Sequence, residues 1–324
     1  MAERDPPRLR RGFDPFRPLH DDAGAMTSGN ENITRASALF REAPAERLRR
    51  VTLGTLRALA PARIGAVAPV ARWWMASFFQ AADRLPDPAT APMDFDGVCG
   101  IARDLSVPTL MKAHRAGLHP AAHAGPIKWW SPPRRCVLQF ESFHMSRRLR
   151  ARLRQNRHRV TFDRDFRGVI KACAEPRAGK WPVTWITPTI MRAYAALHDA
   201  GHAHSFEVWD QDGALVGGGY GVAVGRVFVI ESQFARESHA SKIGFSMLNW
   251  HLAHWGFALN DNKGPSQNVL DMGFHVIARD DYLARLARHA GEIGKSGPWE
   301  VETCLNTVAA WEPGSAAAAL IAAE

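Results

Sequence analysis

The chain has 324 residues, of which 46% are hydrophobic, 23% charged and 9% aromatic. This composition excludes collagen, a coiled coil and a wholly disordered chain, and the length suits roughly two domains of about 150 residues each. The 41 Lys and Arg residues exceed the 32 Asp and Glu residues by nine. Such an excess favours a polyanionic partner, either nucleic acid or a membrane surface.

The cysteine spacing and the N-terminal sequence exclude further classes of protein. The four cysteines lie far apart without a Cys-x-x-Cys pair, which is typical of buried thiols and not of a disulfide framework or a zinc site. The N-terminus holds charges and prolines where a signal peptide needs an apolar run. The apolar stretch 64–79 is broken by Pro69 and Arg72 and is too short to span a bilayer. We expect a cytoplasmic protein without stable membrane insertion.

Residues 1–93 are predicted to precede the main fold. Residues 1–30 lack a hydrophobic period, so we expect a flexible arm. Residues 31–93 are predicted to form a helical extension, broken at Pro44, and a proline-rich linker. The large apolar residues Val70, Trp73, Trp74 and Phe78 recur at spacings typical of one helix face. These aromatic side chains could lie at a membrane interface, but we expect them to cover the next domain.

The pattern after residue 130 predicts short strands and helices. Strands are predicted at residues 136–140, 158–163, 205–210, 215–222, 227–232, 257–261 and 275–278, and helices at 146–155, 240–255, between 261 and 275, and at 280–289. Thr187 and Pro188 form a strong helix start, and Gly201 is a terminator. Turn signals at Gly213 and Gly225 indicate an antiparallel meander. The chain is therefore predicted to be α+β and not a doubly wound parallel sheet.

Residues 144–159 hold seven arginines and no acidic residue. On a helix, Arg147, Arg150 and Arg154 share one face, whereas Leu149 and Leu153 anchor the opposite face. The guanidinium group matches phosphate oxygens well, and such a stripe would give salt-dependent binding that does not depend on sequence. A solvated basic helix is the alternative, but because these arginines are not balanced by any acidic residue in the segment, we favour binding of a polyanion.

Two acidic residues end apolar runs, namely Glu231 and Asp261. A carboxylate at the end of a buried strand is costly unless it is hydrogen-bonded or used in function. The glycine run 217–219 lies inside a strand pattern, which indicates a bulge or a close approach of backbone to a ligand. His119 and His123 have the spacing of a helical zinc site, but nearby Gly and Pro residues argue against one continuous helix. No metal site is expected.

Nine short motifs follow one another over roughly residues 94–290. They are Ile127-Lys-Trp-Trp-Ser-Pro-Pro-Arg134, His144-Met-Ser-Arg147, Thr184-Trp-Ile-Thr187, Leu197-His-Asp-Ala-Gly-His-Ala-His-Ser-Phe-Glu-Val-Trp209, Leu215-Val-Gly-Gly-Gly-Tyr-Gly-Val222, Glu231-Ser232, Ala240-Ser-Lys242, Met272-Gly273 and Arg279-Asp-Asp-Tyr-Leu283. In this order, the set resembles the leucyl/phenylalanyl-tRNA–protein transferase family. The resemblance covers about three fifths of the chain.

The resemblance implies a small N-terminal domain at residues 94–145, a GNAT-like acyltransferase domain at 146–295 and a C-terminal tail at 296–324. The acyltransferase domain would contain a mixed, mainly antiparallel sheet flanked by helices. The resemblance further implies transfer of an amino acid from aminoacyl-tRNA to the N-terminal amine of an acceptor protein, which marks that protein for degradation by the N-degron pathway. Because the aminoacyl ester is already activated, the protein need only hold the amine and the ester together and stabilise the oxyanion. No metal or redox cofactor is expected, and the pyrophosphate loop of acetyl-CoA enzymes is absent from the sequence.

The resemblance also implies site residues. The candidate catalytic residues are Asp261, which would orient the reacting amine, Lys263 and Glu231. The candidate residues of the pocket for the aminoacyl group and the 3′ end of tRNA are Trp129, Trp130, Trp185, Gly219, Gln233 and Asn260. The candidate tRNA-binding residues are Arg147, Arg150, Arg152 and Arg154.

This sequence departs from the family where the chemistry occurs. The family's Asp-Cys-Gln is Asp261-Asn262-Lys263 here, Gly219 and Gln233 stand where the family has methionines, and Asn260 replaces an apolar residue. Ala121 stands where a tryptophan would stack on the terminal adenine. The polar pocket predicts an amino-acid preference other than Leu and Phe. Two alternatives remain open: a catalytically silent paralogue that binds tRNA or N-termini, and an enzyme that transfers the amino acid to a small molecule.

Overall fold

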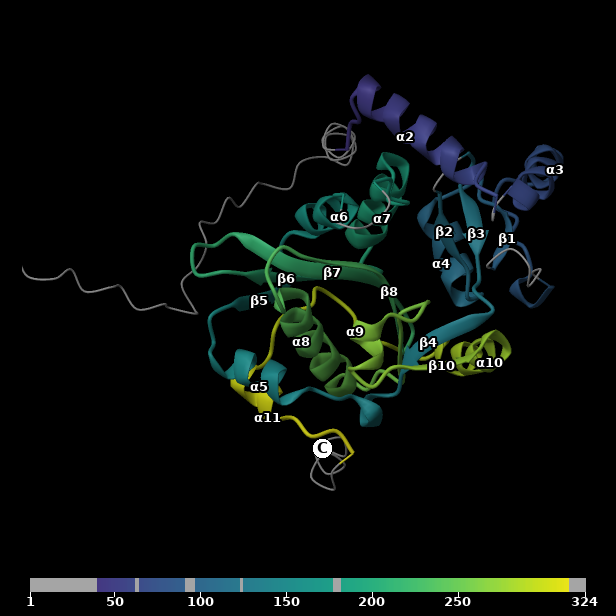
Figure 1. Cartoon of the computed structure of the whole chain (residues 1–324). Helices are drawn as coiled ribbons and strands as arrows, with labels where there is room; N and C mark the ends of the chain where they lie inside the picture. The colour runs from purple at the N-terminus through teal and green to yellow at the C-terminus, as the bar shows by residue number, and fades with distance from the viewer. Residues whose placement is uncertain (1–39, 62–63, 91–96, 123–124, 177–181, 315–324) are drawn as a thin grey trace, which may run out of the picture.

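The computed structural model describes residues 40–61, 64–90, 97–122, 125–176 and 182–314, and the expected arm at 1–30 lies outside them. A seven-stranded sheet with the order β10-β4-β9-β8-β7-β6-β5 forms the centre (Figure 1). Its strands are β4 (Arg134–Leu138), β5 (Arg159–Phe162), β6 (Ala203–Trp209), β7 (Leu215–Val224), β8 (Val227–Ala235), β9 (Leu259–Asp261) and β10 (His275–Ala278). Neighbouring strands are antiparallel except β8 and β9, which are parallel. This mixed sheet confirms the predicted α+β class.

Helices cover both faces of the large sheet, with α6 and α7 on one face and α5, α8 and α11 on the other (Figure 1). Their bounds are α5 (Arg147–Arg154), α6 (Phe166–Ala174), α7 (Pro188–Asp199), α8 (Ala240–His254), α9 (Gln267–Leu270), α10 (Arg279–His289) and α11 (Leu305–Ala310). Two caps explain where helices start. The Thr187 hydroxyl accepts a hydrogen bond from the backbone N–H of Ile190, and the Ser146 hydroxyl accepts one from Leu149. Both predicted helix starts are thereby confirmed.

The N-terminal part contributes two helices and a small sheet. Its elements are α2 (Pro44–Ala58), α3 (Val67–Ser77), β1 (Val98–Ile101), α4 (Val107–Arg115), β2 (His119–Ala121) and β3 (Lys128–Trp130), and the small sheet has the order β1-β3-β2. Short 3₁₀ turns lie at Ile64–Ala66, Pro88–Thr90 and Phe140–Ser142. Pro44 does not break a helix, because it is the first residue of α2, where its missing N–H costs nothing. No helix among the described residues has the length and apolar character needed to cross a bilayer.

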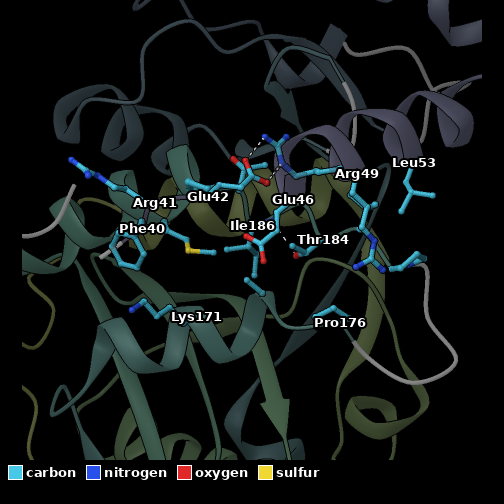
Figure 2. A pocket seen from close by; sticks show the side chains of 17 residues that line it. Phe40, Arg41, Glu42, Glu46, Arg49, Leu53, Lys171, Pro176, Thr184 and Ile186 are labelled. Atoms are coloured by element: carbon cyan, nitrogen blue, oxygen red, sulfur yellow. Dashed lines mark hydrogen bonds and ion pairs between the residues drawn. The ribbon is translucent and has the colours of Figure 1, made fainter. Parts of the chain in front are cut away.

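The N-terminal extension is attached to the main body through α2 and the residues just before it. Phe40 is buried in the core beside α6, where the ammonium of Lys171 lies 5.8 Å from its ring centroid. The Arg50 guanidinium donates two hydrogen bonds, of 2.7 and 2.8 Å, to the Glu42 carboxylate. A cavity of about 310 Å³ separates α2 from α6 and the start of α7 (Figure 2). Phe40 therefore anchors the extension to the body, whereas the Arg50–Glu42 ion pair fixes α2 to the residues just before it.

Two of the expected domain limits do not match the sheets. Strand β4, placed by the sequence in the N-terminal domain 94–145, lies inside the seven-stranded sheet between β10 and β9. The segment that begins at residue 296 was expected to be a C-terminal tail, but Trp299 is buried in the core and α11 packs against α5. Trp299 stacks on His204 with ring centroids 3.9 Å apart. Long-range pairing of this kind leaves no periodic signal in the sequence.

The glycine run in β7 is explained by close packing of the neighbouring elements. A Cβ atom at Gly217 would lie 2.8 Å from that of Ala240, at the start of α8. A Cβ at Gly218 would lie 2.6 Å from the carbonyl oxygen of Phe206 in β6. These approaches are closer than side chains tolerate, so only glycine lets α8 and β6 pack against this part of β7. The glycines of the run thus serve the packing of the scaffold.

Candidate active site

The candidate site lies where the two parallel strands β8 and β9 diverge. Their pairing ends at Val229 opposite Asp261. Two residues further along β8, a register shift places Ile230 opposite Gly221 and Ser232 opposite Tyr220, which leaves Glu231 as the extra residue of a β-bulge. Bulges re-aim side chains, and ligands of open sheets bind beyond the carboxyl ends of parallel strands. Glu231 and Asp261 are therefore brought to the same edge, as their positions in the sequence indicated.

Glu231 is the centre of a buried cluster of charges. The Lys263 ammonium donates to Glu231 Oε2 at 2.7 Å and to the Glu231 carbonyl oxygen at 3.1 Å. His114 Nε2 lies 3.1 Å from Glu231 Oε1, and its Nδ1 lies 2.8 Å from the carbonyl oxygen of Leu110. Both imidazole nitrogens thus face oxygen atoms. Burial alone would raise the pKa of Glu231, but Lys263 and His114 hold that pKa well below its ordinary value.

Asp261 is engaged on both carboxylate oxygens. Arg135 donates to both of them, and the backbone N–H of Lys263 donates to Oδ1 at 2.8 Å. Arg135 also donates to the carbonyl oxygen of Gly117 at 3.2 Å and lies 4.0 Å from the ring centroid of Tyr282. Burial would lower the pKa of Arg135, but the charge of Asp261 raises it above its ordinary value. Asp261 therefore holds the backbone of the turn that carries Lys263.

The turn after β9 directs Lys263 back toward Glu231. Lys263 has a φ of 61°, in the left-handed region that residues with a side chain rarely adopt. Its carbonyl oxygen accepts from the backbone N–H of Cys136 in β4 at 3.0 Å, so the turn is fixed at both of its backbone groups. The ammonium lies 5.5 Å from the ring centroid of Trp185, within the range of a cation–π interaction. Strained backbone held by its surroundings is common at functional sites.

A cleft of about 670 Å³ opens beside this cluster. It is bounded by the second half of β8, the start of α8 and the segment 262–272, and both Glu231 and Gln233 line it. Lys242 lies at the start of α8 on the same cleft. This volume suits a small organic group, and Glu231 is the member of the cluster that borders the cleft, although its side chain is itself fully buried. Gln233 is thus one predicted pocket residue that the structure brings to the cleft.

The other predicted pocket residues take different positions. Asn260 is fully buried and donates from Nδ2 to Asn249 Oδ1 of α8 at 2.7 Å, so its amide faces the core. Gly219 lies beneath the cleft, where an added Cβ would be 2.8 Å from Gln233 Cγ. Trp129 is almost completely buried in the small sheet. Trp130 is partly buried, and its Nε1–H donates to the carbonyl oxygen of Ala121 at 3.3 Å.

Two histidines, His114 and His119, lie near the charged residues of this cluster, and neither was predicted as a partner of Glu231. His114 was not among the predicted site residues, yet it is a direct partner of Glu231. Burial lowers the pKa of His119 well below its ordinary value, and the nearby charge of Lys263 lowers it further. One signal for His114 was present, because it follows Leu110 by four residues on the buried face of α4, where an imidazole requires polar partners.

The arginine helix is confirmed, but its side chains have different surroundings. Leu149 and Leu153 are buried, and Arg147 and Arg154 are exposed. Arg150 donates to the carbonyl oxygens of Ala309 and Trp311 at 2.7 and 2.9 Å. It therefore ties α5 to the end of α11. Arg152 is partly buried and donates to Gln155 at 3.3 Å.

A second group of cations connects α5 with the cleft. Burial lowers the pKa of His239, and the charges of Arg148, Lys242 and Arg152 lower it further. These three cations therefore gather around the residue that precedes α8. Because Lys242 also lines the cleft, the basic surface runs from α5 to the mouth of the candidate site. A helix N-terminus flanked by cations favours phosphate groups.

The fold and the site define an α+β protein with a buried Glu–Lys–His cluster at a cleft between diverging parallel strands and a basic surface leading to it. The family model "Leucyl/phenylalanyl-tRNA protein transferase" matches residues 137–287, and the model of that family's N-terminal domain matches residues 103–133. The chain belongs to this family.

Individual relatives agree with this assignment. The leucyl/phenylalanyl-tRNA–protein transferase of Pseudomonas syringae pv. syringae (strain B728a) is 49% identical over 195 residues, which cover 60% of this chain and 84% of the relative. The protein of the same name from Pseudomonas fluorescens (strain SBW25) is 45% identical over 215 residues, which cover 66% of this chain and 94% of the relative. Among solved structures, that of FemX has a TM-score of 0.35 at 12% identity over 45% of this chain and 60% of that chain, a likeness too weak to assign a fold.

Proposed function

We propose that this protein transfers an amino acid from aminoacyl-tRNA to the N-terminal amine of an acceptor protein, as the names of its relatives indicate for them. The observation that carries the proposal is the buried Glu231–Lys263–His114 cluster beside the cleft, within the segment that the family model matches. The basic surface from α5 to Lys242 supports it, because it would guide the tRNA backbone toward the cleft.

In the proposed reaction the nitrogen of the acceptor amine attacks the ester carbonyl. The new C–N bond forms, the bond from carbonyl carbon to ribose oxygen breaks, and the ribose oxygen takes up a proton. The α-amino group has a pKa near 7.7–8.0, so a reactive neutral fraction exists at neutral pH. The protein contributes position and charge stabilisation, and the reaction as proposed needs no metal or redox cofactor.

Each charged side chain has a distinct proposed role. Among the described residues, two N–H groups of Lys263 are bonded to Glu231, which leaves one for the oxygen that becomes negative in the transition state. Glu231 holds Lys263 in place. Asp261 acts through the Lys263 turn and is therefore a positioning residue, which revises the direct contact with the amine expected from the resemblance.

We also infer the finer features from the resemblance. The diverging strands β8 and β9 support a GNAT-like catalytic domain, preceded by a small domain and by the helical extension. Because strand β4, which begins at Arg134, belongs to the large sheet, we propose that the catalytic domain includes it. The proposed product would enter the N-degron pathway of protein degradation, and the proposed location is the cytoplasm. Gln233 supports a pocket that prefers a more polar amino acid than Leu or Phe.

The proposal is tested by incubating the full chain with tRNA pools, each charged with one labelled amino acid, and a peptide acceptor. We expect label at the peptide N-terminus, identified by mass spectrometry, and loss of transfer in Glu231→Gln. Tight tRNA binding without transfer from any charged pool would contradict the proposal and support a silent paralogue. Label found only on a small-molecule amine would support the third alternative.

A further inference from the structure

The two helices of the N-terminal extension, α2 and α3, turn apolar side chains toward solvent. Twelve large apolar side chains are exposed among the described residues, and ten of them lie between residues 48 and 79. Exposed apolar residues scattered singly are normal, whereas a concentration of this kind marks an interaction surface. Figure 1 shows α2 and α3 at the outer edge of the molecule.

Helix α2 is amphipathic, but its apolar face points away from the protein. Leu48, Val51 and Leu59 share one face of the helix and are 69%, 51% and 51% exposed. The opposite side, which carries Arg50 and Gly54, faces the body of the protein. The cavity of about 310 Å³ next to α2 (Figure 2) and a second cavity of about 560 Å³ are lined from this inner side, and Arg49 and Arg47, at the flanks of the helix, border the first and the second cavity. The outer face, with Leu48, Val51 and Leu59, lines neither of these two cavities.

Helix α3 repeats this arrangement. Val67, Trp74 and Phe78 are spaced by seven and four residues on one face and are 41%, 45% and 54% exposed, and Phe79, just after the helix, is 88% exposed. The helix is nevertheless held against the body, because Arg103 donates to the carbonyl oxygen of Ser77 at 2.6 Å and lies 5.0 Å from the ring centroid of Phe78. The aromatic face is thus a fixed feature of the surface. Of the aromatic residues expected to cover the next domain, Phe78 contacts Arg103 of that domain, but Trp74 is 45% exposed, so the expectation is wrong for Trp74.

This segment carries a net positive charge. Residues 40–79 contain seven arginines, two glutamates and no other charged residue, which gives 7 − 2 = +5. One of the glutamates, Glu42, is neutralised by Arg50. Arg47 and Arg49 are exposed on α2, and Arg72 is exposed on α3. Both family models begin after this segment, at residue 103 or later, so the surface belongs to a part of the chain outside the family match.

We propose that the outer faces of α2 and α3 bind peripherally to an anionic membrane surface. Aromatic and aliphatic side chains flanked by arginines are typical of helices that lie in the headgroup region. Arginines beside such a face add attraction to anionic lipids. The binding would hold the catalytic domain close to the membrane without inserting a helix across it.

The test uses the full chain in co-sedimentation with vesicles of phosphatidylglycerol and phosphatidylcholine, and with vesicles of phosphatidylcholine alone. We expect binding to the anionic vesicles that decreases with salt. The triple substitution Trp74→Ser, Phe78→Ser and Phe79→Ser should weaken this binding on the order of a hundredfold, because three large apolar side chains are lost from the interface. Ile293→Ser is the matched control, since this side chain is 94% exposed elsewhere on the surface and should leave binding unchanged.

A second pair of substitutions tests the electrostatic part. Arg47→Gln with Arg49→Gln should weaken binding to anionic vesicles by about fivefold for each arginine and leave the weak binding to phosphatidylcholine unchanged. Circular dichroism should show the same melting temperature for all variants, because the altered side chains are exposed. The proposal is overturned if the wild type does not bind vesicles, or if the triple variant binds as well as the wild type. It is also overturned if the wild type is a dimer in solution that the triple substitution dissociates without any binding to vesicles.

Discussion

Removal of the Lys263 charge should destabilise the fold and raise the pH at which acid unfolds it. Lys263 Nζ lies 2.7 Å from Glu231 Oε2, and Glu231 is fully buried. At an effective dielectric constant of about 20 the attraction across this distance is roughly 6 kcal/mol before desolvation is subtracted. Breaking a buried pair by removing one partner typically costs about 3–5 kcal/mol. Lys263→Met should therefore lower the melting temperature at pH 7 by about 5–10 °C.

The pH dependence follows from the depressed pKa of Glu231. A carboxyl group whose pKa is lower in the folded than in the unfolded protein adds stability above its unfolded pKa, near the ordinary value of 4.5, and loses that stability as the pH falls through the folded pKa. In the wild type this loss is confined to strongly acidic solution. In Lys263→Met the folded pKa rises, since the largest charge that lowers it is gone. The stability contributed by ionised Glu231 should then disappear at a higher pH.

The measurement is thermal unfolding by circular dichroism between pH 7 and pH 3 for the wild type, Lys263→Met, Glu231→Gln and the double variant. The double-mutant cycle should give a coupling energy of about 3 kcal/mol at pH 7. Lys263→Gln, which keeps a donor but no charge, should fall between the wild type and Lys263→Met. Lys242→Met is the matched control, because Lys242 lines the same cleft without contacting Glu231. A coupling energy near zero, or an unchanged acid transition in Lys263→Met, would refute the reasoning.

Three further predictions concern the tRNA surface and the pocket. Arg148→Ala with Arg152→Ala should reduce the salt slope of tRNA binding by about two, whichever tRNA is used, and a filter-binding titration that shows an unchanged slope would contradict this role. Arg150→Ala should lower stability by about 1–3 kcal/mol in thermal unfolding, because two buried carbonyl oxygens lose their donor, and it should leave the salt slope almost unchanged. Gln233→Met should shift the preference for the donor aminoacyl-tRNA toward Leu and Phe in a competition among charged tRNAs. Gly219→Ala should lower the free energy of unfolding by about 1–3 kcal/mol, because the added methyl group overpacks the site. An unchanged preference in Gln233→Met would show that this amide does not contact the aminoacyl group.

The sequence was most informative where local chemistry decides the structure. The start of α7 follows from a Thr cap and a Pro in the first turn, and the meander of β6, β7 and β8 follows from alternation and turn glycines. The arginine helix was predictable from its two buried leucines. The limits of the domains were not, because β4 joins the large sheet through β9 and β10, which lie more than 100 residues further along the chain.

Side-chain direction was the second quantity that the sequence could not supply. Asn260 and Gln233 both carry amides in the predicted pocket, yet Asn260 bonds to Asn249 in the core and Gln233 lines the cleft. Arg150 and Arg154 were assigned to one phosphate-binding face, yet only Arg154 is exposed. In each pair the residue type is the same or similar, and the difference comes from a neighbour distant in sequence. Residue type and spacing therefore identified the helix and the strands of the candidate site, but they did not show which of their side chains face the cleft or solvent and which face the core.

The cluster around Glu231 shows why a departure from the family needs a structure to be interpreted. From the sequence, Lys263 in place of the family's glutamine added a positive charge near the ester. The β-bulge at Glu231 and the left-handed backbone at Lys263 bring the two side chains into contact across 32 positions of sequence. The lysine therefore does not add an isolated charge to the pocket, because it neutralises a carboxylate that His114 also contacts. Substrate preference at this site should depend on the pair as a unit, so Glu231→Gln and Lys263→Gln should affect transfer non-additively.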